Sequence, residues 1–586
     1  MFKPSKGAAC GVLSLLGLLA LPASPASAQA RDLDLLEVYE IAAAMVSRQN
    51  PLFLFPGLQA DRMTVNGNGG EYHVVINGFG LPGSTATVPE PMLIRLPQIA
   101  TDGDLIEVTV DGLPTSTIMP GGQSLKLIDP RFRGEWSIER KGFERFELSV
   151  NRIAFQGAGI AYTANDLSAR LSQQGEKHVL AFDLGGFKAE YGDSFTGTER
   201  AKRLRLALSA PRETVSAQAL LALAYRLSGF ALNEPEEQAA LAPPAPRVST
   251  LDGLSIELIF DGEEWEQVVP PSSGRFGRVT ANVQVEPGAS PGLSRVSVDA
   301  SLKSFEQRLE QIDVRINKPS TFSLVIDGLE SQSLADLFLD RQDGFEEPQL
   351  GQAVGLQGAI DIGRVAVLMP AIDLDFSADG LAGRIDSVPD AEGAQSLDLV
   401  GQAAQVKVSN WANREQLEPL ATNIIIPGLP TEAQIGFGVE GLSAADVQGL
   451  LSAALALDLG GVAAAFPTDL TALELVLRDS FYRSKLVDAE WSGRLRPRAG
   501  RIPVQGTLEL VTGPLAPMQI GMQQSIATPV PAVSQSMSAG ILGLTLLQTF
   551  ATREDGGRLR FEMTFPEEGG LPLVNGRPLP FQQFIR

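Results

Sequence analysis

Apolar and polar residues alternate along most of the chain. In the segment 203–208, with the sequence RLRLAL, every second residue is leucine. The segment 372–376 alternates in the same way, and Ile372, Leu374 and Phe376 are expected to face inward. This alternation is typical of strands with one buried and one solvated face, and it favours antiparallel pairing. Similar strands are expected at 147–155, 178–184, 255–260, 276–286, 295–303, 311–318, 321–327, 472–479, 504–511 and 558–564.

Turn dipeptides separate these segments. Asp-Gly and Asn-Gly pairs tolerate the positive φ that tight hairpins need. Asp-Gly occurs at 102, 111, 252, 261, 327, 343, 379 and 555, and Asn-Gly occurs at 66, 68, 77 and 575. The sequence therefore predicts a mainly β (α+β) fold, in which large antiparallel sheets are built from strand meanders with interspersed short amphipathic helices.

Helices are expected at a few places among the strands. The first has an apolar stripe at helical spacing. Asp34 and Glu37 are spaced as a capping box at its start, and Asn50-Pro51 ends the segment. Further helices are expected at about 216–227 and 537–551. The stripe consists of Leu35, Val38, Tyr39, Ala42, Met45 and Val46.

One strand-and-helix pattern occurs twice. In the segments 322–339 and 435–451, a strand reaches an acidic residue followed by Gly and Leu, and a serine then precedes an amphipathic helix. Ile326-Asp327-Gly328-Leu329 matches Val439-Glu440-Gly441-Leu442 at an offset of 113 residues. This similarity favours a strand-plus-helix unit used repeatedly, and duplication is one possible origin.

The first 30 residues have the three parts of a secretory signal peptide. Lys3 and Lys6 precede an apolar stretch at 8–21, and small residues follow up to Ala28 or Ala30. The apolar stretch is too short to span a bilayer. Cys10, the one cysteine of the chain, lies within this segment, so the mature protein is expected to contain neither disulfide nor thiolate. Export to the periplasm of a Gram-negative cell is predicted.

The mature chain is expected to divide at a linker. Residues 233–249 are rich in Pro, Glu and Ala and have no periodicity, which is typical of a linker. A β-rich region with a leading helix is expected at 31–232, and a β-rich region with strand-plus-helix units at 250–586. A weaker break lies at 340–352.

Charge and hydropathy limit the function. The chain has 47 basic and 69 acidic residues, a formal net charge of −22. Nucleic acid is disfavoured as a partner, because its binding depends on Lys and Arg neutralising phosphates. No transmembrane segment is expected in the mature chain, since the most apolar stretch, 450–466, is broken by Asp458 and by Gly460-Gly461.

Three motifs suggest cofactor or metal chemistry, but each is better explained by structure. Residues 78–83 fit G-x-G-x-x-G, yet the following segment ending in Pro89 is not helical as a dinucleotide site requires. Asp373, Asp375 and Asp379 invite a calcium site, but the order of an EF-hand is missing and strand alternation explains the first two. The segment Asp102-Gly103-Asp104 fails in the same way. We therefore expect a turn at 78–83 and at Asp379-Gly380, strand positions at Asp373 and Asp375, and no cofactor.

The histidines, acids and arginines of the sequence do not define a functional site. The two histidines are each expected to be structural. His73 has no second ligand at metal spacing, and His178 begins a strand with Leu, Phe and Leu at positions 180, 182 and 184. Paired-carboxylate catalysis stays open, since sequence alone gives no distances. Alternating Arg494, Arg496 and Arg498, with Arg483, Lys485 and Arg501 nearby, permit an anion or lipid-headgroup site. Pro497 instead favours a charged edge strand. No residue is assigned a catalytic, cofactor-binding or metal-binding role.

The overall plan resembles exported alphaproteobacterial proteins of the family called domain of unknown function 2125. The resemblance rests on the signal peptide with the helix at 33–46, the Gly-, Asp- and Leu-rich strand meander, and the ending. That ending has a helical segment at 537–551, a strand at 558–565 and the segment 573–579. The family implies an envelope protein and supplies no catalytic residues.

Three functions follow as hypotheses. The first is a non-enzymatic periplasmic binding or scaffold protein whose apolar sheet face holds an acyl chain. The alternative is an extracytoplasmic hydrolase, which needs two acids about 5 to 10 Å apart across a cleft. The third is a structural partner within an envelope complex, recognisable by a large exposed apolar patch. A lipid or an envelope protein is the expected partner.

Overall fold

The computed structural model describes two compact units in which strands predominate, as predicted. Unit 1 comprises Met1–Pro120 and Pro130–Leu148, and unit 2 comprises Gly121–Asp129 and Ser149–Arg586. The expected signal peptide lies outside the described residues, as does nearly all of the expected linker. The described residues are 31–46, 62–77, 91–100, 104–113, 115–118, 124–157, 159–192, 197–227, 248–268, 271–339, 350–389, 395–410, 418–443, 445–447, 449, 473–498, 504–527, 530–567 and 571–578.

Unit 1 combines an antiparallel sheet with the predicted first helix, α2 (Leu35–Val46). The capping box is formed, because the Asp34 and Glu37 amides each donate to the other's carboxylate, at 3.0 and 2.8 Å. Val38 and Ile41 of α2 are fully buried. The sheet pairs in the order β2-β3-β4-β6-β9, with bounds β2 (Arg62–Asn68), β3 (Glu71–Asn77), β4 (Met92–Pro97), β6 (Leu105–Gly112) and β9 (Arg131–Ser137).

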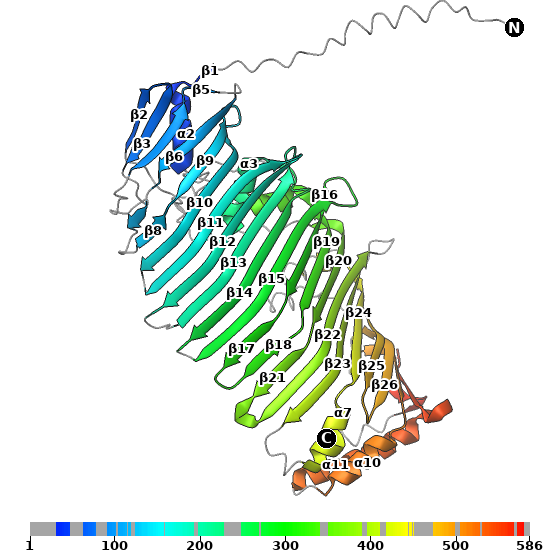
Figure 1. Ribbon diagram of the computed structural model, residues 1–586. Helices are drawn as coiled ribbons and strands as arrows, with labels where there is room; N and C mark the ends of the chain where they lie inside the picture. The colour runs from blue at the N-terminus through cyan, green and yellow to red at the C-terminus, as the bar shows by residue number, and fades with distance from the viewer. Residues whose placement is uncertain are drawn as a thin grey trace, which may run out of the picture. The chain divides into compact units, whose positions relative to one another are not determined.

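Unit 2 is dominated by one long antiparallel sheet (Figure 1). Its strands pair mostly in chain order, as expected of a meander, from β11 to the short β30. The bounds are β11 (Ile160–Gln174), β12 (Lys177–Tyr191), β13 (Gly197–Pro211), β14 (Ser255–Gln267), β15 (Ser272–Pro287), β22 (Leu374–Pro389), β23 (Gln395–Asn410), β24 (Glu432–Leu442), β25 (Glu474–Arg483), β26 (Asp488–Pro497), β27 (Val504–Thr512), β29 (Leu559–Phe565) and β30 (Leu573–Val574).

Between β15 and β22, each position in the sheet is filled by two successive short strands. β15 pairs with β16 through one half of its length and with β17 through the other. The same interruption separates β18 from β19 and β20 from β21. The backbone stays connected across it, because the Gly277 amide donates to the Ser304 carbonyl at 2.9 Å. The bounds are β16 (Leu293–Leu302), β17 (Phe305–Leu309), β18 (Asp313–Ile316), β19 (Ser320–Glu330), β20 (Leu350–Ile362) and β21 (Val365–Met369).

The predicted strand-and-helix pattern is present at both places. Gly328 has φ +96° near the end of β19, which leads into α5 (Ser331–Leu339). Gly441 has φ +88° near the end of β24, and the Ser443 hydroxyl then accepts the Asp446 amide at 3.2 Å in the manner of a helix cap. A third helix, α3 (Ala217–Leu227), occupies the predicted position after β13. The two segments therefore share a glycine with positive φ near the end of the strand, before the helical residues.

Three details differ from the sequence analysis. The expected linker does not divide the sheet, because β13 and β14 on either side of it pair directly, and the compact units divide near residues 120–148 instead. Ile372 is not in a strand, since 370–372 form a 3-10 turn and Asp373 has φ +49°; the strand begins at Leu374. The last helix, α11 (Pro531–Phe550), begins earlier than predicted, and α10 (Ala516–Ser525) precedes it.

Candidate functional site

One face of the unit 2 sheet carries an unbroken line of apolar residues, which we call the apolar row. Each member lies directly opposite the next on the neighbouring strand, so the row runs across the strands. The members are Leu171, Leu180, Leu208, Ile256, Val283, Val298, Leu324, Gly358, Ile385, Leu399, Phe437, Leu477, Gly493, Leu508, Met563 and Val574. At ~4.8 Å between strands, the row is on the order of 70 Å long.

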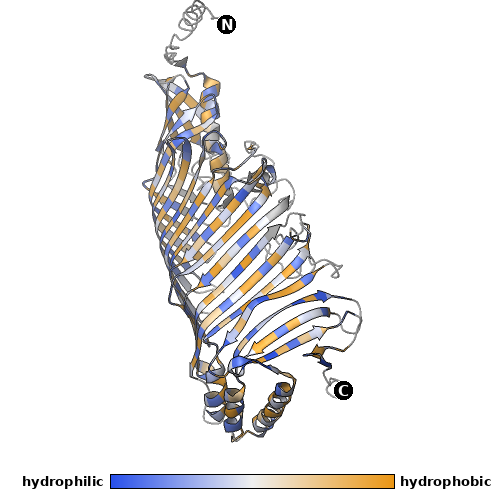
Figure 2. Cartoon of the chain, turned by 90° about the vertical axis from the view of Figure 1, so that its right-hand side faces the viewer, coloured by the Kyte–Doolittle hydropathy of each residue, from blue (hydrophilic) through white to orange (hydrophobic). Residues whose placement is uncertain are grey.

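The row is covered at one end and open farther along. Leu171, Leu180 and Leu208 are buried, and α3 packs against β12 and β13, the strands that carry the last two. Leu399 is 39% exposed, and Ile435, on the same face of β24, is 57% exposed. Figure 2 shows the alternation of apolar and polar positions along the strands of this sheet. The described helices therefore cover only part of the apolar face.

The interruption in the strands does not reverse the two faces. Gly262 on β14 has φ +58° at this level. Phe260 lies before it and belongs to the apolar face, and its ring centroid is 5.1 Å from that of Phe276, which lies on the far side of the interruption. The ring centroid of Trp265 is 6.2 Å from those of both Phe276 and Phe305, so these rings lie together on one face. The apolar face is thereby continuous along the strands as well as across them.

Two carboxylates lie on this apolar face, and they touch. Glu199 on β13 and Glu263 on β14 share a side-chain hydrogen bond. The Tyr191 hydroxyl on β12 donates to Glu199 Oε2 at 2.7 Å. Among the described strand positions that register places on this face from β11 to β29, no other acid occurs. The sequence offered no signal for this pair, because strand register alone brings the two glutamates together.

The apolar surroundings change the protonation of this group. Burial, followed by the hydrogen bond and charge of Glu199, raises the pKa of Glu263 to about 7. Burial and the same glutamate raise the pKa of Tyr191 to about 12. Near neutral pH the pair therefore holds a shared proton for part of the time. Carboxylates in direct contact leave no room for the water or sugar that a hydrolase places between acids about 5 Å or more apart.

The opposite face of the sheet is charged. Arg203 on β13 forms a bidentate hydrogen-bonded ion pair with Asp183 on β12, which lowers the pKa of Asp183. Arg275 and Glu306 continue such pairing at 3.0 Å on β15 and β17. A hollow of about 560 Å³ on this side of the sheet is lined mainly by charged and polar side chains such as Arg200. This face is suited to water, and Trp265 is the one large apolar side chain among the residues that line the hollow.

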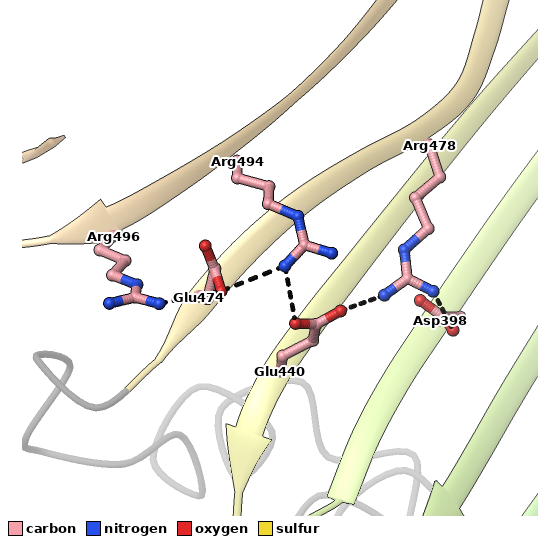
Figure 3. A network of polar contacts seen from close by, with 6 residues as sticks. All are labelled: Asp398, Glu440, Glu474, Arg478, Arg494 and Arg496. Atoms are coloured by element: carbon pink, nitrogen blue, oxygen red, sulfur yellow. Dashed lines mark hydrogen bonds and ion pairs between the residues drawn. The ribbon is translucent and has the colours of Figure 1, made fainter. Parts of the chain in front are cut away.

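The arginines of β26 lie in an ion-pair network, not in an open anion site (Figure 3). Arg494 reaches Glu440 at 3.3 Å and Glu474 at 3.4 Å, and Arg496 shares Glu474 at 3.4 Å. Arg478 pairs with Glu440 and, at 3.2 Å, with Asp398. Acidic partners thus offset each of these positive charges.

Two further basic residues of that segment, Arg498 and Arg483, are also engaged, whereas only the backbone amide of Lys485 has a partner among the contacts described, the Pro427 carbonyl at 3.0 Å. Arg498 donates to the carbonyls of Pro566 and Glu567, at 3.0 and 2.6 Å. Arg483 pairs with Glu432 at 3.0 Å and lies over the Phe481 ring. The expected edge strand was wrong, because β26 pairs with β25 and β27, and Pro497 is tolerated as its last residue. Arg501 lies outside the described residues.

The other predicted candidates do not come together. His73 lies on β3 of unit 1, 3.5 Å from Glu71, whereas His178 is buried on β12. Asp375 accepts a hydrogen bond from Ser409 at 2.7 Å, and Asp379 pairs with Lys318 at 3.1 Å. Among the described residues, no group of three acids, histidines or cysteines is placed to hold a metal ion.

Of the two glycine-containing motifs, only Asp104 lies within the described residues. The glycine-rich segment 78–83 and residues 102–103 lie outside the described residues. Asp104, which followed them in the calcium alternative, instead accepts hydrogen bonds from the Ser137 hydroxyl and the Glu139 amide, both at 2.7 Å. It therefore has a local role in fixing the turn after β9.

Comparison with known proteins identified no relative of this chain. The sequence matches no known family profile, and neither a curated protein nor a solved structure matches it. The resemblance to the domain of unknown function 2125 family stays a prediction. Within the part of the chain that the structure describes, no helix is both long enough and apolar enough to cross a membrane.

Proposed function

We propose that this protein is a non-enzymatic envelope protein of the periplasm that binds lipid acyl chains along the apolar row. The row itself carries the proposal. An antiparallel sheet ordinarily buries its apolar face against a second layer. Here the described helices cover one end of the face, and residues such as Leu399 and Ile435 are exposed.

The length of the row favours a surface along which acyl chains bind at many positions, and not a pocket that holds one molecule. A length on the order of 70 Å is several times the ~15 Å of hydrocarbon in one bilayer leaflet. An acyl chain could therefore occupy many equivalent positions. The face contains no ion pair among its described strands, so a chain moving along it displaces little bound water from polar groups.

The charged opposite face supports the same assignment. A sheet with two apolar faces would aggregate, and a sheet with two charged faces would offer nothing to a lipid. The ion pairs around Arg203 and Arg478 keep one side in water while the other remains available. Export by the predicted signal peptide would place such a face in the compartment between two membranes.

The test uses the protein in the form that its native host exports, purified without detergent. Lipid extraction followed by mass spectrometry should find co-purified lipid on the wild type. Leu399→Asp puts a charge into the row and should lower the bound lipid about tenfold, since burying an unpaired carboxylate is costly. Val400→Asp is the matched control, because Val400 faces the other side, directly opposite Arg384.

Equal lipid on both variants would contradict the proposal. So would a wild type that carries no lipid and takes up none when mixed with lipid micelles. A protein subunit that co-purifies in place of lipid would favour the structural-partner hypothesis instead.

A further inference from the structure

The far end of the unit 2 sheet carries a group of helical segments, which we call the terminal helical cluster. It consists of η4 (Ala421–Ile425), α7 (Ile426–Gly428), α10 and α11. α10 packs against α11 and against η4. The contacts are close, because a side chain on Gly521 would meet the Asn423 carbonyl and one on Gly540 would meet the Met522 thioether. The segments therefore form one packed group.

The cluster has no charged residues. None occurs between Glu509 and Arg553, which includes all of α10 and α11, or between Glu418 and Glu432, which includes η4 and α7. The rest of the chain differs sharply, since 20% of all residues are charged. Surface helices in water normally carry charges on their outer side. These sequences instead suit an environment in which charge is costly.

The outer surface of the cluster is apolar. α11 has 20 residues and none of them is buried. Leu542 is 71% exposed, and Leu546 lies one helical turn later on the same side. Large exposed apolar side chains occur on the neighbouring segments as well. The set is Ile426, Ile520, Ile526, Leu542, Leu546 and Leu547.

Four hydroxyl groups of α11 donate hydrogen bonds to carbonyls of the same helix. Ser536 donates to the Ala532 carbonyl at 2.9 Å, and Ser538 donates to the Ser534 carbonyl at 3.0 Å. Thr545 donates to the Ile541 carbonyl at 2.8 Å. A hydroxyl without a partner is costly in an apolar medium, whereas one bonded to its own helix is tolerated there. These hydroxyl groups can thus leave water with their donors satisfied.

The cluster adjoins the end of the apolar row. Leu544 and Phe550 of α11 pack against the core formed by Leu515, Phe561 and Val574. Val574 is the last member of the row, and Met563, the member before it, packs on the same core. The apolar face of the sheet therefore continues directly into the cluster.

We propose that the terminal helical cluster binds the surface of a lipid bilayer, with α10 and α11 lying between the headgroups and the acyl chains. An interfacial position fits better than a spanning one, since no described helix is apolar enough to cross. Electrostatic attachment to anionic headgroups does not apply, because the cluster has no cation. The docking extends the proposed function by bringing the end of the row to lipid, but it does not depend on lipid in the row.

The test is co-flotation of the exported form of the protein with vesicles of uncharged phosphatidylcholine. The wild type should float with the vesicles, and about 0.5 M salt should leave binding unchanged because no charge pairing is involved. The triple variant Leu542→Ser, Leu546→Ser, Leu547→Ser should partition at least about tenfold less. The matched control changes three exposed apolar residues of unit 1, as Leu36→Ser, Leu93→Ser and Ile99→Ser, and should bind like the wild type.

A second variant covers the case in which the triple variant fails to fold. Gly543→Glu adds one charge on the exposed side of α11, where a side chain meets no atom within 4 Å, and it should also reduce binding. Docking is overturned if the wild type does not float, if salt releases it, or if binding is unchanged in both variants. These results are distinct from those for the row, because Leu399→Asp should lose bound lipid and still float.

Discussion

The carboxyl groups of Glu199 and Glu263 are hydrogen-bonded to each other on neighbouring strands, on a sheet face where the described strand positions from β11 to β29 hold no other acid. The contact joins two acids that would repel each other if both were ionised. It therefore forms most readily with one proton between them. The Tyr191 hydroxyl donates a further hydrogen bond to the Glu199 carboxylate, at 2.7 Å.

Replacing Glu263 should alter how stability depends on pH. The pKa of Glu263 is about 7 in the folded protein and 4.5 ordinarily, so the folded state binds the extra proton. The wild type should thus lose stability as pH rises from about 4.5 through about 7. Glu263→Gln should remove this loss and be the more stable protein at about pH 8, as measured by urea unfolding at about pH 5 and pH 8.

The control for that experiment is Glu264→Gln, the next residue of β14, which removes the same charge from the charged face. It should keep the wild-type pH dependence. If both variants follow the same curve, the net charge of the chain explains the effect and the pair does not.

A side chain at Gly274 should disturb the aromatic group on the apolar face. The Trp265 indole occupies the place of a Cβ atom at Gly274. Gly274→Ala should therefore destabilise the protein by about 1–3 kcal/mol, as overpacking does. Gly401→Ala is the matched control, because Gly401 also lies on this face and a Cβ there meets nothing within 4 Å. Thermal unfolding with equal melting temperatures for the two variants would refute this account.

The capping box should contribute measurably to unit 1. Asp34→Ala removes the acceptor for the Glu37 amide and should cost about 0.5–2 kcal/mol. Glu37→Gln keeps an acceptor for the Asp34 amide, so it should cost less. Chemical unfolding of unit 1, followed by hydrogen exchange of the α2 amides, distinguishes the two variants. Equal protection of α2 in both would mean that the cap is not needed.

The network around Arg478 should be worth more than an isolated surface pair. Arg478→Met leaves Asp398 and Glu440 without the cation they share and should cost about 1–2 kcal/mol. Adding Asp398→Asn should recover part of that loss. Arg133→Met is the comparison, because Arg133 is 73% exposed and pairs only with Glu107 among the contacts described, and it should change stability by less than about 0.5 kcal/mol.

Local features of the fold could be predicted from the sequence because they arise between close neighbours in the chain. The alternation at 203–208 predicted a strand, and the spacing of Asp34 and Glu37 predicted a helix cap; both are present. Departures occurred where a local pattern competed with a turn. The strand expected from Ile372 begins at Leu374, since Pro370 opens a 3-10 turn in front of it.

Features that depend on register could not be predicted. Nothing in one strand shows that Leu399 will lie opposite both Ile385 and Phe437, which is what makes a row of separate apolar residues. The Glu199–Glu263 contact joins residues on either side of the expected linker, so treating that linker as a boundary concealed the pair. The choice between a charged edge strand and an ion-pair network for Arg494 likewise depended on its neighbours across the sheet.

Because the strands pair regularly, the length of the apolar row is set by the number of strands in the meander. Each added hairpin would contribute two more strands to the apolar row and would lengthen it by about 10 Å. Gene segments that encode one hairpin, or one strand-and-helix segment such as the one that contains Gly328 or Gly441, are thus natural increments of length. Selection can therefore change the length of the apolar row in steps of one hairpin.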